Sequence, residues 1–217
     1  MNKTFAYYKD YLGFIEDSIR QILIHDRIYL DTALIIRDNP KLNKNNPFLT
    51  WMMRAYISDI TIRIRRLTDK RKDVQSLIKF LEEVKRDGVI RSRKHHVDLY
   101  RTPPFFLEEE GEKSFDYLAG KGSQEYSKDK VQKDLELIQE ICETILDYTN
   151  TFVSHSRANV KSGRKLATFE DIRKAIKTLD QIIIKYFLLI KAANRGKSLL
   201  PDLGTDWITI FNRPWSE

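Results

Sequence analysis

The sequence predicts an all-α protein, folded as an antiparallel bundle of four to five long helices. Apolar residues recur three and four positions apart over long stretches, which is the spacing of one face of an α-helix. No stretch shows the two-residue alternation that a half-buried strand requires. Long helices without strands pack by default as an antiparallel bundle.

The chain has 217 residues, and we expect residues 1–217 to form a single domain. Hydrophobic residues make up 41% and charged residues 32%, a balance typical of a globular protein and unlike that of a disordered one. No apolar run approaches the ~18 residues of a membrane span, and the first residues are too polar for a secretory signal. We therefore expect a cytoplasmic protein with no membrane partner.

The first two helices are expected over residues 5–37 and from Pro47 through Leu67. Asp38-Asn39-Pro40 ends the first one, because the residue before a proline is disfavoured in the α conformation. Pro47 suits the first turn of the second helix. The end of that helix carries a basic cluster of Arg63, Arg65, Arg66, Lys70 and Arg71.

A third helix is expected from Val74 to about Arg86, with Asp73 as its cap. Residues 89–127, which follow it, lack helical spacing and are predicted to be a long irregular insertion. They are too many for a plain connection in a compact domain. Three alternatives remain for the insertion: a functional flap, a partly disordered loop, or a loop with a short helix around residues 114–118.

The central helix is predicted to begin near Ser127 and to end at a lone histidine, His155. Its apolar side consists of Val131, Leu135, Ile138, Cys142, Ile145, Thr149 and Phe152. Cys142 is the single cysteine of the chain and lies on this apolar side, so we expect a buried, inert thiol.

The last long helix is predicted to open at Thr168, where Thr168-Phe169-Glu170-Asp171 is close to a capping box. Gly196 is expected to cap its C-terminal end. Residues 199–217 form a tail rich in Trp and Phe, which we expect to pack back on the bundle.

The basic excess of the chain belongs to one third of it. Between Arg54 and Arg101 there are 14 Lys+Arg and 7 Asp+Glu, whereas the rest of the chain is balanced and the total charge is +7. Such an excess attracts phosphate backbones or an acidic protein. A solvated helix face with paired charges is the alternative interpretation.

Two segments with histidines are candidate sites. The sequence has no Gly-rich phosphate loop, no paired-cysteine spacing and no His-Glu-x-x-His helix, so no metal or cofactor is predicted. His155, with Arg157 just beyond it, could act as a general acid/base on a ribose-phosphate link, or it could simply cap its helix. In the basic segment 91–96, Arg91 and Arg93 are expected to contact phosphate.

Three parts of the chain resemble HEPN-like proteins of the abortive-infection AbiU type. They are residues 58–70 with 76–81, residues 150–155, and residues 206–215. The resemblance spans nearly the whole chain and implies a HEPN-like bundle that forms a homodimer and acts in phage defence or as a toxin. It also implies RNA as a ligand, since many members of the wider HEPN group are metal-independent ribonucleases, and an antitoxin or another protein as a partner.

The active helix of that wider group carries an arginine a few residues before a histidine, and this histidine matches His155. The arginine would fall at residues 148–150, where the sequence has Tyr-Thr-Asn. The resemblance implies that His155 is the acid/base and Asn150 orients the substrate. Phosphates would then be held by Arg65, Arg66 and Arg157. Whether the chain cuts RNA stays open, and the alternative is a non-catalytic dimeric interaction or sensing module that binds nucleic acid or an acidic protein.

Overall fold

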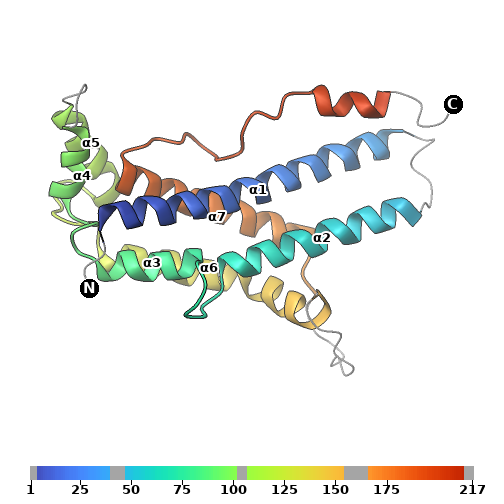
Figure 1. Ribbon diagram of the computed structural model, residues 1–217, viewed down its shortest axis with the longest axis horizontal. Coiled ribbons are helices and arrows are strands. Elements are labelled where there is room, and N and C mark those ends of the chain that lie inside the picture. The colour runs from blue at the N-terminus through green and yellow to red at the C-terminus, as the bar shows by residue number, and fades with distance from the viewer. Residues whose placement is uncertain (1–3, 40–46, 102–106, 154–165, 213–217) are drawn as a thin grey trace.

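A computed structural model describes residues 4–39, 47–101, 107–153 and 166–212. Within these ranges the chain forms seven α-helices, a π-helical turn and a 3-10 helix, and its only extended pairing is an isolated bridge between Ser92 and Glu125 (Figure 1). The four longest helices are α1 (Phe5–Asp38), α2 (Pro47–Leu67), α6 (Lys128–Tyr148) and α7 (Phe169–Lys191). The predicted all-α class is therefore confirmed.

The long helices run antiparallel along a common axis (Figure 1). Helix α1 packs against α2 and α7, while α6 packs against α2, α7 and the shorter α3 (Leu77–Arg86), which continues the line of α2. The apolar faces of all five helices merge into one core, in which Ile15, Ile60, Ile138 and Ile183 are fully buried. This packing confirms the predicted bundle.

Two helix starts illustrate how local chemistry sets the boundaries. Helix α7 begins at the predicted capping box, in which the Thr168 Oγ accepts from the Asp171 N–H at 3.1 Å and Asp171 accepts from the Thr168 N–H at 2.9 Å. Helix α3 begins three residues later than predicted, because Ser76 and not Asp73 provides the cap. The Ser76 hydroxyl accepts from the Lys79 N–H at 3.3 Å.

The C-terminal end of α7 differs from the prediction. Ala192, and not Gly196, adopts the left-handed conformation that stops the helix, with φ 52° and ψ 27°. Its N–H donates to the Leu188 carbonyl at 3.1 Å. Gly196 lies in the next turn with φ 70°, so the chain has already left the helix when it reaches the glycine.

Residues 89–127, predicted to be irregular, contain two helices instead, and the second of them includes the short helix around residues 114–118 that was one of the three alternatives. Helices α4 (Arg93–Tyr100) and α5 (Glu108–Ala119) pack against each other at one end of the bundle, and both contact α7 (Figure 1). The segments that enter and leave this pair are tied together, since the Arg93 N–H donates to the Gln124 carbonyl and the Tyr126 N–H to the Arg91 carbonyl, both at 2.8 Å.

The C-terminal segment returns along the bundle after α7 and runs beside α1 in Figure 1. Leu199 is buried, and its N–H donates to the buried carboxylate of Asp180 on α7 at 2.9 Å. A 3-10 helix, η2 (Asp206–Asn212), follows. Leu199 thus joins the start of the tail to α7, and packing of the aromatic residues of the tail on the bundle stays a prediction.

Candidate functional site

The end of the central helix changes from α to π geometry. Helix α6 stops at Tyr148, and the next turn, η1 (Thr149–Val153), is π-helical and packs against α2. Thr149 and Thr151 are buried in this turn, and the Thr149 hydroxyl donates to the Ile145 carbonyl at 2.7 Å. Asn150 lies between them and is half-buried. Short π-helical turns occur frequently at functional sites, and this one holds the first residues of the predicted motif.

The two predicted site residues beyond this turn, His155 and Arg157, lie outside the described residues. The structure therefore locates Asn150 on η1 and leaves the acid/base of the predicted motif as an expectation from the sequence.

Arg65 and Arg66 occupy the last turn of α2. Arg65 is half-buried, whereas Arg66 is exposed and lines a cavity of about 190 Å³ together with Arg63. A helix C-terminus carries partial negative charge, which favours cations at these positions. The exposed guanidinium of Arg66 remains in a position where it can also meet a phosphate group.

Arg91 has a different role from the phosphate contact predicted for it. Its side chain is only 1% exposed. The guanidinium donates to the Val84 carbonyl at 3.0 Å, to the Tyr126 carbonyl at 2.8 Å and to the Glu125 carboxylate at 3.2 Å. These bonds join the end of α3 to the start of α6, so the structure assigns Arg91 to the core and does not support a phosphate contact.

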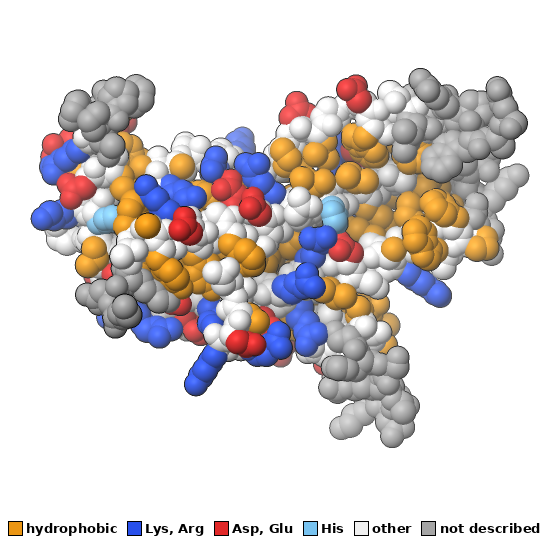
Figure 2. All heavy atoms as spheres, in the orientation of Figure 1, with side chains coloured by type: hydrophobic (Ala, Val, Ile, Leu, Met, Phe, Trp, Pro, Cys, Tyr) orange, Lys and Arg blue, Asp and Glu red, His pale blue; other side chains and the backbone are white. Residues whose placement is uncertain are grey.

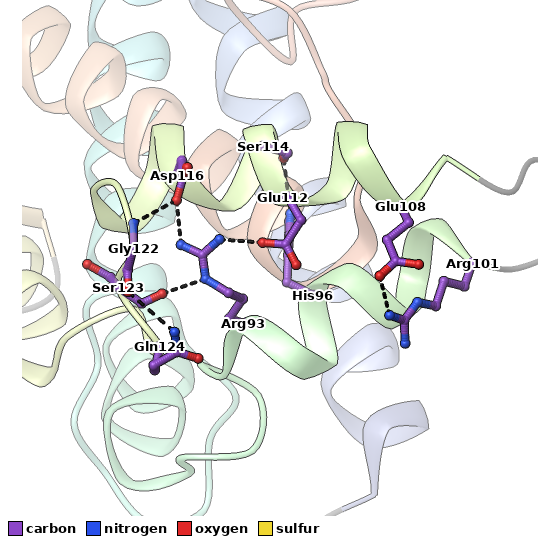
Figure 3. A network of polar contacts seen from close by, with 10 residues as sticks. All are labelled: Arg93, His96, Arg101, Glu108, Glu112, Ser114, Asp116, Gly122, Ser123 and Gln124. Carbon is purple, nitrogen blue, oxygen red and sulfur yellow. Dashed lines mark hydrogen bonds and ion pairs between the residues drawn. The ribbon is translucent and has the colours of Figure 1, made fainter.

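Arg93 is likewise occupied by partners inside the protein (Figure 3). Its guanidinium makes ion pairs with Glu112 and Asp116 of α5, and its Nε donates to the Ser123 carbonyl at 2.6 Å. The hydrogen bonds that the guanidinium donates to Asp116 and Glu112 raise the pKa of Arg93. Two acids thus surround one base, and the predicted phosphate contact is not supported here either.

His96, from the same basic segment, is a fully buried link between helices (Figure 3). Its Nδ1 lies 3.0 Å from the Leu189 carbonyl of α7, and its Nε2 lies 3.0 Å from the Ser114 hydroxyl of α5. A carbonyl only accepts, so Nδ1 carries the hydrogen and Nε2 accepts from Ser114. Burial lowers the pKa of His96, and the neutral ring joins α4 and α5 to the bundle.

A histidine that the sequence analysis did not single out is more accessible. The Nδ1 of His25 on α1 lies 2.7 Å from an oxygen of Asp59 on α2, and Arg63 donates to the same carboxylate at 2.8 Å. The side chains of His25, Asp59 and Arg63 are 36%, 39% and 30% exposed. The Asp59–Arg63 pair follows from its four-residue spacing on a helix, but the third member is 34 positions away in sequence.

Metal and thiol chemistry find no support in the described residues. Among them, no three His, Cys, Asp or Glu side chains are grouped so that they could hold a metal ion. Cys142 is buried on α6, and burial raises the pKa of its thiol to about 12, which disfavours the reactive thiolate. In the same ranges, no helix has both the length and the apolar character needed to cross a membrane.

Comparisons with known proteins give one match. Residues 15–209 match the HEPN family described as AbiU2. No curated protein and no solved structure matches the chain. The match begins within α1 and ends within η2, and it includes every element between them.

Proposed function

The chain belongs to the AbiU2 family of HEPN proteins, and on this premise we propose that it is a phage-defence or toxin-type protein that engages RNA. The observation that carries the proposal is that the helix changes from α to π geometry at the residues where the predicted motif begins. The π-helical turn η1 begins at Thr149, directly before Asn150, and it packs against the basic helix α2. Such turns occur frequently at functional sites.

In this proposal His155 is the general acid/base and Asn150 orients the substrate. Arg65, Arg66 and Arg157 hold phosphates, in place of the arginine that the motif lacks at residues 148–150. An arginine is the preferred phosphate ligand because its planar guanidinium can donate two parallel hydrogen bonds. We further propose that the protein acts as a cytoplasmic homodimer, with an antitoxin or another protein as a partner.

The test is the substitution His155→Ala, with the neighbouring Ser156→Ala as the matched control. Loss of the imidazole should abolish RNA cleavage, or toxicity on expression in cells, and should leave the melting temperature nearly unchanged. Ser156→Ala removes no ionisable group and should retain activity. Equal activity in His155→Ala and the wild type would remove His155 from the mechanism.

A second candidate function is a non-catalytic dimeric interaction or sensing module. It is favoured by exposed apolar side chains on the second half of α1 and the first half of α2, two helix ends that extend beyond α6 and α7 in Figure 1. The exposed members are Ile28, Leu34, Phe48, Trp51 and Met53. Clusters of exposed apolar residues are typical of protein-interaction surfaces.

RNA binding measured over a range of salt concentrations tests both candidate functions. It also distinguishes them from a role in which the protein binds only other proteins. Phosphate contacts predict an affinity that falls steeply with ionic strength, with or without cleavage. Binding without cleavage would favour the interaction module. No binding at low salt would contradict RNA engagement in both forms.

A further inference from the structure

The seam between α1 and α2 carries two facing rows of polar side chains. On α1, Ser18, Gln21 and His25 follow one another at three and four positions, and on α2 Asp59, Arg63 and Arg66 do the same. Residues with this spacing share one side of a helix. Because the two helices pack antiparallel, the His25 end of one row meets the Asp59 end of the other. Figure 2 shows a histidine and a group of basic side chains over this seam.

Asp59 connects the two rows and orients the imidazole ring of His25. Burial alone would raise the pKa of Asp59, but hydrogen bonds from Arg63 and His25 lower it below its usual value, so the carboxylate is charged at neutral pH. A carboxylate only accepts hydrogen bonds. The Nδ1 of His25 therefore donates to Asp59 at 2.7 Å, and the Nε2 of this partly exposed ring is left for a ligand.

Beyond Asp59, the same seam opens into the cavity of about 190 Å³. The polar part of its lining consists of Ser18, Arg63, Arg66 and Gln75, and Phe14 and Leu67 supply the apolar part. None of these residues is acidic. Arg63, Arg66 and Gln75 have side-chain hydrogen-bond donors, whereas the Ser18 hydroxyl donates to the Phe14 carbonyl at 2.9 Å.

Both arginines of the cavity have donors to spare. The Nε–H of Arg63 donates to Asp59 and lies 2.8 Å from each carboxylate oxygen. Its two Nη groups have no hydrogen-bond partner among the described residues. Arg66 makes no ion pair within the described part of the chain and is exposed. This differs from Arg91 and Arg93, whose donors are used inside the protein. Two available guanidinium groups beside a cavity without acids form a typical oxyanion site.

We propose that the α1–α2 seam is a phosphate-binding site, in which Arg63 and Arg66 hold a phosphate of single-stranded RNA and the Nε2 of His25 contacts the same strand. The choice of RNA rests on the proposed function, whereas the affinity for phosphate rests on the two arginines and the cavity. This site is separate from the Asn150 turn, and Arg66 is the one residue that the two proposals share.

The experiment measures binding of a fluorescent oligouridylate to the full chain over a range of salt concentrations. The test variant is Arg63→Gln/Arg66→Gln. The matched control is Arg27→Gln/Arg86→Gln, which removes the same charge from two exposed arginines that pair within their own helices, with Asp31 and Glu82. The test variant should bind at least about tenfold more weakly, because it loses two charged contacts. Its salt slope should fall by about 0.7, because the two arginines hold one phosphate and a single strand contributes ~0.7 per phosphate.

The control variant should lose less than about threefold, the effect expected of charge without a contact. His25→Gln should weaken binding by a smaller factor than the double arginine variant, since it removes one contact to the strand and leaves both guanidinium groups. Equal losses in the test and control variants would overturn the site, because net charge alone would then explain the binding. The melting temperature of each variant, measured in parallel, shows that it is folded.

A second measurement distinguishes failure of this site from failure of the proposed function. Inorganic phosphate is compared with chloride at equal ionic strength for its effect on the melting temperature. If the wild type binds no RNA, RNA engagement fails, yet a stabilisation by phosphate that is lost in Arg63→Gln/Arg66→Gln would support the site with free phosphate as its ligand. If neither RNA nor phosphate distinguishes the two proteins, the phosphate site is wrong.

Discussion

Arg91 provides a direct test of which basic residues maintain the fold. Its guanidinium is buried and donates to two main-chain carbonyls and to Glu125. Substitution by methionine keeps a long, flexible side chain in the space and removes all the donors. The carbonyls of Val84 and Tyr126 would then lose these partners in a place that water does not reach, so the substitution tests the contacts and not the volume.

The structure sets the size of the effect. A hydrogen bond to a charged group contributes about 1.5–3 kcal/mol, and Arg91 donates two such bonds to buried carbonyls. Glu125 is 53% exposed, so its carboxylate is solvated when the guanidinium is removed and adds little to the loss. Methionine recovers part of the packing, so we expect Arg91→Met to lower the free energy of unfolding by about 3 kcal/mol. For a chain of this size, this corresponds to a melting temperature lower by about 6–12 °C.

The assay is urea unfolding followed by circular dichroism, with Arg86→Met as the control. The side chain of Arg86 is 74% exposed and lies 3.8 Å from Glu82, so its loss should change the free energy of unfolding by less than about 0.5 kcal/mol. An Arg91→Met protein within about 1 kcal/mol of the wild type would refute the structural role of this residue.

Two further predictions concern the helix end and the buried histidines. Ala192→Gly should stabilise the protein by about 0.5–1 kcal/mol, because it removes the strain of a left-handed alanine, about 1–2 kcal/mol, and adds an entropic cost of about 0.4–1 kcal/mol. The control Ala55→Gly, in the exposed interior of α2, should destabilise the protein by about 1 kcal/mol. Changes of the same sign in urea unfolding would contradict this account. Burial lowers the pKa of His96 and of His95 in the folded protein. As the pH falls, these two histidines are therefore protonated at a higher pH in the unfolded chain than in the folded one. The free energy of unfolding should therefore decrease below about pH 6.5, by up to about 1.4 kcal/mol per pH unit for each histidine, and His96→Gln should show a weaker pH dependence; an equal dependence would exclude His96 as a source.

The long helices could be predicted because their signals are local. A helix in a bundle buries one face, so its apolar residues recur at helical spacing whatever its neighbours are. The start of α7 is also local, since Thr168 and Asp171 satisfy each other within one turn. Helices α4 and α5 could not be predicted in this way. They are short and rich in charge, and they depend on contacts between distant residues, such as Arg93 with Asp116 and His96 with Leu189.

The candidate site shows the same division between local and distant information. Sequence reasoning placed Asn150 and the basic end of α2 on helices that the structure confirms. It could not distinguish the arginines from one another, because the partners that occupy Arg91 and Arg93 come from other helices. It also missed His25, whose partner Asp59 lies on the adjacent helix. The residues three and four positions from His25 on its own helix carry no charge, so its sequence context gives no sign of the carboxylate that orients it.

The electrostatics of the bundle favour the α1–α2 seam over the basic segment 91–96 as the place where phosphate binds. An arginine or lysine between residues 54 and 101 attracts a phosphate only where no carboxylate already neutralises its charge. Arg93 faces two acids, and Arg91 is enclosed by carbonyls. Arg63 shares one acid with His25, and Arg66 faces none among the described residues. A phosphate that enters the seam therefore meets a local excess of positive charge. A phosphate near the basic segment 91–96 meets arginines whose charges are already neutralised.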